Sequence, residues 1–176
     1  QRRSRPPQGD PVVRVGVISD THVDSRRRVI PAAVWQAFAG VDCILHAGDI
    51  ARQDVLDELA ALAPVHAVHG NVDPPELVST LKAALVLDLD GARIGLTHGH
   101  LGRGRSTPQC ALSLFTGAEG LRAVVFGHSH EPYNNVQRGV LLFNPGSPTE
   151  RRRQPRPSYG FLTIENGLVR GEIAYI

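Results

Sequence analysis

Five short segments rich in histidine, aspartate and asparagine carry the side chains best suited to chemistry, and each directly follows an apolar run. They are Asp20-Thr21-His22, Gly48-Asp49, Gly70-Asn71-Val72-Asp73, His98-Gly99-His100 and Gly127-His128-Ser129-His130. Neutral imidazole nitrogens and carboxylate or amide oxygens are common ligands of first-row metal ions. One histidine pair alone is equally typical of a solvated loop, so the prediction of a metal site depends on all five segments.

The spacing and types of these residues favour two ions over one. In extended backbone, residues i and i+2 lie on the same side with Cβ atoms about 6–7 Å apart, so His128 and His130 suit neighbouring ions. The histidine, aspartate and asparagine side chains of the five segments are too many for one catalytic ion and suit two ions that share a carboxylate, about 3.5–4 Å apart. Because the set holds no cysteine, we expect two divalent ions, Mn²⁺ first, with Ni²⁺, Zn²⁺, Fe or Co²⁺ as alternatives.

The elements that position these residues follow from the pattern of apolar residues. Buried strands are expected over residues 12–18, 41–45, 65–68, 93–97 and 123–126, and helices over 31–38, 54–62 and 107–118. Hairpins are expected at Asp90-Gly91, between 85–89 and 93–97, and at Asn166-Gly167, between 159–164 and 168–173. With a further strand over 140–143, the expected fold class is α/β, with two packed mixed β-sheets flanked by helices. Ligand sites in such sheets form at the carboxyl ends of the strands, where the five segments would converge.

Composition and charge narrow the class of protein. The first ten residues contain three arginines and one aspartate and so have a net charge of +2. The whole chain also has a net charge of +2, so the remainder of the chain is neutral. We therefore expect a basic Pro/Arg-rich tail over 1–11, a single domain over 12–176, and no nucleic-acid partner. The longest apolar stretches are too short for a membrane span. Cys43 and Cys110 are each expected to be a small buried residue and not half of a disulfide, which fits a reducing compartment, so the predicted location is cytoplasmic.

The five segments, with Asn144-Pro145-Gly146-Ser147 and Pro157-Ser158-Tyr159 after them, resemble the calcineurin-like metallophosphoesterase superfamily, and its small YfcE-like phosphodiesterase branch most. The resemblance runs from about residue 14 to 176 and implies an αββα sandwich. It implies that Asp49 bridges two metal ions. The remaining metal ligands would be Asp20, His22 and His130 on one ion and Asn71, His98 and His128 on the other.

The resemblance further implies hydrolysis of a small phosphate ester by a metal-bridging hydroxide, with Asn71 helping to offset charge on the phosphate. Many relatives carry a histidine after this asparagine, which is thought to protonate the leaving group. Here the position is Val72, so we expect phosphodiesters with good leaving groups to be better substrates than alkyl monoesters. His100 is the candidate for a substitute acid.

Other polar residues allow two interpretations. Arg153, in the run 151–153 followed by Arg156, could bind the anionic substrate, although a charged run is more often a solvated face. His46, His66 and His69 are expected to support the site or the core and not to ligate metal. Asp73 is expected either to ligate metal or to orient the loop that contains Asn71.

Two other function classes are compatible with this fold. The retromer small subunit shares the fold and acts as a protein-binding scaffold with a degraded metal site, whereas all seven positions here keep competent ligands. A nuclease is disfavoured by the neutral body of the chain. The sequence leaves a homo-oligomer open.

Overall fold

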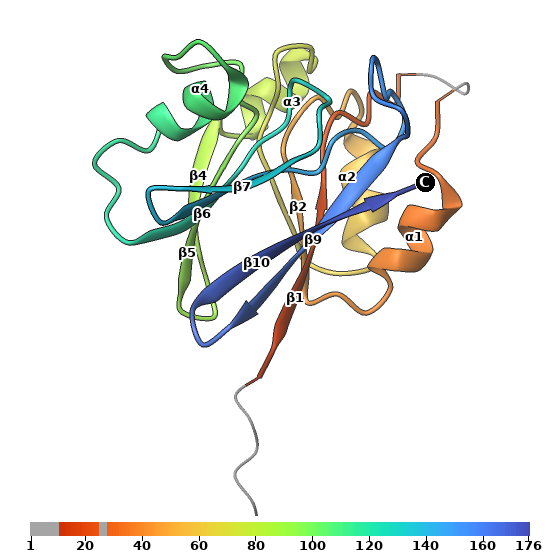
Figure 1. Cartoon of the computed structure of the whole chain (residues 1–176). Coiled ribbons are helices and arrows are strands. Elements are labelled where there is room, and N and C mark those ends of the chain that lie inside the picture. The colour runs from red at the N-terminus through yellow and green to blue at the C-terminus, as the bar shows by residue number, and fades with distance from the viewer. Residues whose placement is uncertain (1–10, 25–27) are drawn as a thin grey trace, which may run out of the picture.

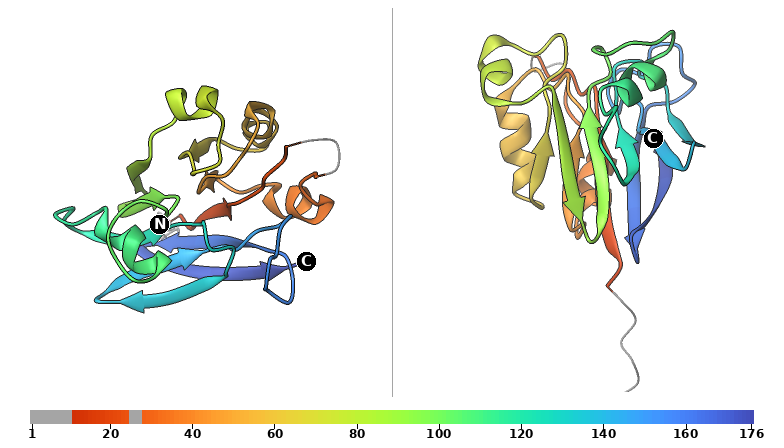
Figure 2. Two further views of the ribbon diagram at one scale, coloured as in Figure 1. Left: turned by 90° about the horizontal axis from the view of Figure 1, so that it is seen from above. Right: turned by 90° about the vertical axis from the view of Figure 1, so that its left-hand side faces the viewer.

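The computed structural model describes residues 11–24 and 28–176, so the predicted basic tail over 1–11 lies, except for Pro11, outside the described residues. Two mixed sheets of five strands each pack face to face (Figures 1 and 2). The first has the order β10 (Leu168–Tyr175), β9 (Ser158–Glu165), β1 (Val13–Ile18), β2 (Cys43–His46) and β3 (Val65–Ala67). The second has the order β4 (Ala84–Leu89), β5 (Ala92–Thr97), β6 (Leu121–Val125), β8 (Val140–Asn144) and β7 (Tyr133–Gln137).

Helices cover the outer face of each sheet, which gives four layers and confirms the predicted fold class (Figure 2). The helices α1 (Ala32–Phe38), α2 (Gln53–Ala60) and α3 (Pro75–Thr80) contribute buried residues to the apolar cluster outside the first sheet. The helix α4 (Thr107–Ser113) packs on the second sheet through Ala111, with Phe115 just after it. Between the sheets, side chains such as Val17, Leu45 and Val125 form the central core.

The parallel pairings bring the carboxyl ends of six strands to one edge of the sandwich. In the first sheet, Ile18 of β1 pairs with His46 of β2, and His46 pairs with Ala67 of β3. In the second sheet, Val125 of β6 pairs with Leu96 of β5 and with Phe143 of β8. The five ligand-bearing segments follow β1, β2, β3, β5 and β6, so the fold delivers all of them to this edge.

Three elements differ from the sequence-based expectation. β7 and α3 were not expected, because β7 exposes three consecutive residues and α3 is only six residues long. Neither element contains enough buried residues to show a hydrophobic period. The helix α4 ends at Ser113 and not at the expected 118, since the chain continues in tighter turns and Gly117 adopts a φ of +89°.

Candidate metal centre

Most of the ligand-bearing residues have a backbone conformation that non-glycine residues rarely adopt. The φ angles of Asp20, His22, Asp49, His128 and His130 lie between 44° and 68°. Such conformations cost of order 1–3 kcal/mol each and cluster at functional sites. Hydrogen bonds between the loops hold them, because Asp20 N–H donates to the Gly48 carbonyl at 3.0 Å and His128 N–H donates to the Asp20 carboxylate at 3.0 Å.

The first group of convergent side chains consists of Asp20, His22 and His130, whose ligand atoms all lie within 4.8 Å of one another. The His130 Nε2 atom is 3.3 Å from Asp20 Oδ1 and 3.2 Å from His22 Nε2. On its other side, the His130 ring donates its Nδ1 hydrogen to the Glu150 carbonyl at 2.5 Å. Because Nδ1 is engaged in that bond, Nε2 is the ring nitrogen directed into the group, as is usual for a metal-binding histidine.

The second group consists of Asp49, Asn71, His98 and His128. The His98 Nε2 atom is 3.2 Å from Asp49 Oδ2 and 3.1 Å from Asn71 Oδ1, and the His128 Nδ1 atom is 3.0 Å from the same Asn71 oxygen. His98 donates its Nδ1 hydrogen to the Ala47 carbonyl at 2.7 Å. Its Nε2 atom faces the oxygen atoms of Asp49 and Asn71.

Asp49 lies between the two groups. Its Oδ2 atom is 3.7 Å from His22 Nε2 on one side and 3.2 Å from His98 Nε2 on the other. Asp20 also reaches toward both groups, since its Oδ1 atom is 4.0 Å from His98 Nε2. The two groups thus form one continuous centre.

The side chain of Asp20 indicates that this centre is suited to binding cations. This side chain is fully buried, and its Oδ1 atom has no hydrogen-bond donor within residues 11–24 and 28–176. A buried carboxylate oxygen without a donor is costly unless a cation satisfies it. The surrounding atoms are oxygen and imidazole nitrogen, the ligand set of first-row divalent ions.

The charge states of the centre also suit cations. Burial raises the pKa of Asp49, but the hydrogen bond and charge of His98 outweigh burial and lower that pKa to about 2. Burial also raises the pKa of Asp20, but the interactions with His130 and His98 outweigh burial and lower that pKa. Both carboxylates are therefore ionised at neutral pH.

Asp73 orients the ligand loops, as one of the two sequence-based interpretations expected. Its buried carboxylate accepts the backbone N–H groups of Asp49, Ile50 and Gly70 at 3.0, 2.7 and 2.7 Å. His46 also has the expected supporting role, since its fully buried ring lies 3.1 Å from Thr21 Oγ1 and accepts Gly48 N–H at 3.2 Å. Burial lowers the pKa of His46 to about 4, so this ring is neutral.

His100 lies beside the second group and not within it. Its ring centroid is 5.3 Å from that of His98 and 6.2 Å from that of His128, and its Nδ1 atom is buried without a partner in the described part of the chain. Burial and the neighbouring histidines lower the pKa of His100 to about 4, so the ring is neutral at pH 7. Val72 is 53% exposed next to Asn71, which leaves room for a larger side chain.

The loop after β8 supports the centre in ways that the sequence did not indicate. The Ser147 hydroxyl donates to the Asp20 carbonyl at 2.7 Å, and the Glu150 carbonyl orients His130. Arg152 donates to the His128 carbonyl at 3.3 Å, and both Arg152 and Arg153, the candidate substrate contact, are exposed. The sequence signals of this loop were the turn Asn144-Pro145-Gly146-Ser147 and the arginine run 151–153, and neither indicates these bonds.

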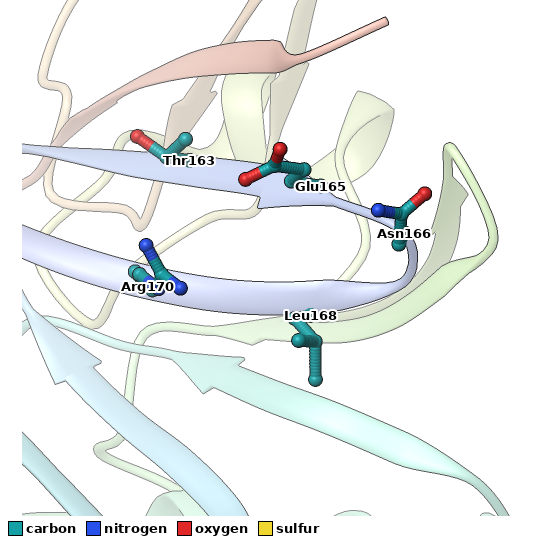
Figure 3. Close-up of a pocket in the computed structure, with 5 residues that line it drawn as sticks. All are labelled: Thr163, Glu165, Asn166, Leu168 and Arg170. Atoms are coloured by element: carbon teal, nitrogen blue, oxygen red, sulfur yellow. The ribbon is translucent and has the colours of Figure 1, made fainter. Parts of the chain in front are cut away.

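A separate hollow of about 250 Å³ lies on the hairpin of β9 and β10 and is lined by Thr163, Glu165, Asn166, Leu168 and Arg170 (Figure 3). Ile164 pairs with Val13, at the start of β1, so this hollow lies at the end of the sheet away from the metal centre. Its lining includes one carboxylate and no histidine or cysteine, so it does not resemble a second metal site.

An αββα sandwich with this group of histidine and carboxylate side chains at one edge defines a metallophosphoesterase. Residues 13–167 match the model of the calcineurin-like phosphoesterase superfamily domain, and the chain therefore belongs to this superfamily. A probable metallophosphoesterase of Methanothermobacter thermautotrophicus is 41% identical over 160 residues, which cover 90% of each chain. These matches agree with the resemblance seen in the sequence.

Two further relatives bear on function. A protein of Methanocaldococcus jannaschii named a phosphodiesterase is 26% identical over 146 residues, which cover 76% of this chain and 83% of that protein. The crystal structure of wild-type Vps29 from Entamoeba histolytica complexed with zinc superposes with a TM-score of 0.70 at 25% identity, over 93% of this chain and 99% of that chain. Within residues 11–24 and 28–176, no helix is long and apolar enough to cross a bilayer.

Proposed function

We propose that this chain is a dinuclear metal-dependent phosphodiesterase that hydrolyses small phosphate esters. The observation that supports the proposal most is the position of Asp49 Oδ2 between His22 and His98, beside the unpartnered Asp20 Oδ1. Asp20, His22 and His130 would hold one divalent ion, and Asn71, His98 and His128 the other. Asp49 would be shared by both, and Mn²⁺ is the ion we expect first.

When bound, two divalent ions lower the pKa of a coordinated water toward neutrality and offset the charge of the phosphate. The residues of the chain then have separate tasks. Asn71 uses its oxygen toward the centre, which leaves its side-chain N–H groups to donate to a phosphate oxygen. Asp73, Ala47 and Glu150 fix the ligand loops and the orientations of the His98 and His130 rings before substrate arrives.

The preference for diesters with good leaving groups follows from the groups near the leaving-group position. Val72 cannot donate a proton, and the neutral ring of His100 is a much weaker acid than an imidazolium ion. His100 can still donate one N–H hydrogen bond to an ester oxygen. An aryl oxide leaves without protonation, but an alkoxide does not, so alkyl monoesters are expected to react slowly.

We further propose that residues 12–176 act as one domain in the cytoplasm. Residues from Asp20 to His130 contribute to the same centre, which supports a single domain. Both cysteines are free thiols in the structure, which fits a reducing compartment. Cys43 is buried as expected, whereas the expected burial of Cys110 was wrong, since it is only partly buried on the short helix α4.

The second candidate function is a protein-binding scaffold like Vps29, and it rests on the similarity to the Vps29 structures. Because one of those structures contains zinc, metal content alone does not separate the two functions. Catalytic turnover does.

The test is hydrolysis of bis(p-nitrophenyl) phosphate with Mn²⁺, Ni²⁺ or Zn²⁺ by the wild type, by Asp49→Ala and by Asp57→Ala. Asp57 is exposed on α2 and serves as the matched control. We expect Asp49→Ala to lose at least about a hundredfold in kcat/KM, because it removes a ligand shared by both ions, and Asp57→Ala to keep full activity. Equal activity of Asp49→Ala and the wild type would refute the proposal, and no turnover by any variant would favour the scaffold.

A further inference from the structure

The backbone of Arg152 shares its unusual conformation with the metal-ligand residues. Among the described residues, three non-glycine residues with positive φ, namely Asp90, Arg138 and Asn166, each precede a glycine in a hairpin turn. The others all lie at the edge that carries the metal centre: Asp20, His22, Asp49, Ala51, His128, His130 and Arg152. Arg152, with a φ of +50°, is the only one of these that contributes a long cationic side chain.

The loop that contains Arg152 is fastened to both sides of the centre. Ser147 donates to the Asp20 carbonyl at 2.7 Å, Thr149 donates to the Thr21 carbonyl at 2.7 Å, and the Glu150 carbonyl accepts from His130 at 2.5 Å. The backbone before Arg152 therefore has little freedom. Because the backbone at the base of the Arg152 side chain is fixed, only the side chain itself loses freedom when it binds, which lowers the entropic cost.

The three consecutive arginines have different surroundings. All three side chains are exposed, and Arg151 donates to the carbonyl of Gln154 within its own turn. Arg152 instead turns back and donates through Nη1 to the carbonyl of His128 at 3.3 Å. This single bond leaves most of its N–H donors available, since a guanidinium offers a fork of several.

The charge of Arg152 is not neutralised nearby. The neighbouring Glu150 carboxylate is 3.0 Å from Arg28, and Arg152 takes part in no ion pair within residues 11–24 and 28–176. The positive charge is near enough to His128 to contribute to lowering the pKa of that ring, along with burial and His98. An unpaired guanidinium therefore stands next to a candidate metal ligand, at the rim of the centre.

The Asn71 amide and the two-ion centre would bind the oxygens of the reacting phosphate. An additional positive charge at the rim of the centre would therefore be best matched by a second anion on the substrate. A terminal phosphate matches the guanidinium fork best, because its oxygens accept two parallel hydrogen bonds.

We propose that Arg152 is a specificity-determining residue that selects phosphodiesters with a second phosphate group on the ester arm that lies beside His128. The proposal rests on the phosphodiesterase function of the metal centre and adds a substrate class to it. The sequence suggested Arg153 for substrate recognition, and the proposal assigns this role to Arg152 instead.

The test compares two substrates, p-nitrophenyl ethyl phosphate and its derivative with a phosphate at the end of the ethyl arm. We expect Arg152→Gln to lower kcat/KM for the phosphorylated substrate about tenfold to a hundredfold, mainly through KM, as is typical of a lost charge-assisted contact. The same variant should change kcat/KM for the unphosphorylated substrate less than about twofold. Arg152→Gly tolerates the positive φ and removes the whole side chain. It should lose as much kcat/KM for the phosphorylated substrate as Arg152→Gln does, which separates recognition by the side chain from distortion of the loop.

Arg138→Gln is the matched control. Arg138 is exposed with a φ of +51°, and it lies in the turn before β8, at the end of that strand away from Asn144. The Arg138→Gln variant should act on both substrates as the wild type does.

Binding can be measured without turnover by calorimetry. The ligand is the phosphonate analogue of the phosphorylated substrate, in which a methylene group replaces the oxygen to the aryl ring. Arg152→Gln should bind this analogue about tenfold or more weakly.

Three results would overturn the inference: equal effects of Arg152→Gln on both substrates, no effect on either, or the selective loss in Arg153→Gln instead. If the metal-loaded wild type hydrolyses neither substrate, the proposed function fails. The binding of the phosphonate then still decides the role of Arg152, since an unchanged affinity in Arg152→Gln contradicts it.

Discussion

The substitution Asp73→Asn tests how the chain holds its metal centre before any metal binds. The Asp73 carboxylate accepts four backbone N–H groups, those of Ile50 and Ala51 on Oδ1 and those of Asp49 and Gly70 on Oδ2. An asparagine has one oxygen and one amide NH₂ group. Two of the four N–H donors therefore lose their acceptor and face the hydrogens of the amide.

The size of the effect follows from these bonds. A hydrogen bond to a charged group contributes about 1.5–3 kcal/mol, and two bonds to one carboxylate are less than additive, so we expect a loss of about 3 kcal/mol in the free energy of unfolding. For a chain of this length, that corresponds to a fall in Tm of roughly 6–12 °C. Because Asp73 also fixes the backbone of Asp49, metal affinity should fall about tenfold to a hundredfold.

The assay is urea unfolding in the presence of EDTA, followed by metal competition against a chromophoric chelator. EDTA removes the contribution of bound metal, so the first measurement reports the hydrogen bonds alone. Asp57→Asn, in an exposed position of α2, should change stability by less than about 0.5 kcal/mol. The reasoning is refuted if Asp73→Asn matches this control in both stability and metal affinity.

Three further predictions concern single positions. Val72→His should raise turnover of alkyl monoesters such as glycerol phosphate, because Val72 is 53% exposed and its backbone N–H, which donates to Asp49 at 3.1 Å, is kept; unchanged turnover counts against our account of the leaving group. Gly70→Ala should abolish metal binding in equilibrium dialysis while Gly139→Ala does not, because an added Cβ at Gly70 would lie 2.0 Å from the Asp49 carboxylate and one at Gly139 meets no atom within 4 Å. With a thiol reagent at pH 8, Cys110 should react in the folded protein and Cys43 only after unfolding, since burial raises the pKa of Cys43 to about 11; rapid labelling of both would contradict the buried position of Cys43.

The ligand-bearing residues could be predicted because the strands before them have strong patterns. β1, β2 and β6 are runs of buried apolar residues, and a histidine or aspartate that follows such a run lies at the sheet edge where ligands bind. The Asp-Gly and Asn-Gly turns were equally readable, because both central residues need a positive φ. The third hairpin turn, at Arg138-Gly139, was missed, since arginine is not typical of that position.

The parts that could not be predicted depend on contacts between distant segments. Glu150 acts through its backbone carbonyl, which every residue has, so no side-chain pattern indicates its bond to His130. Arg152 could not be distinguished from its two arginine neighbours until its bond to the His128 carbonyl was known. β7 was missed because its exposed residues carry no apolar alternation at a sheet edge.

The central claim is that Asp49 joins two metal ions in one centre, and the metal content of the purified protein tests it most directly. After loading with Mn²⁺ and removal of unbound metal, we expect about two ions per chain in the wild type by elemental mass spectrometry, as two-metal hydrolytic sites require. Asp49→Ala should retain one ion or none. One ion in the wild type, or two ions in Asp49→Ala, would contradict the account.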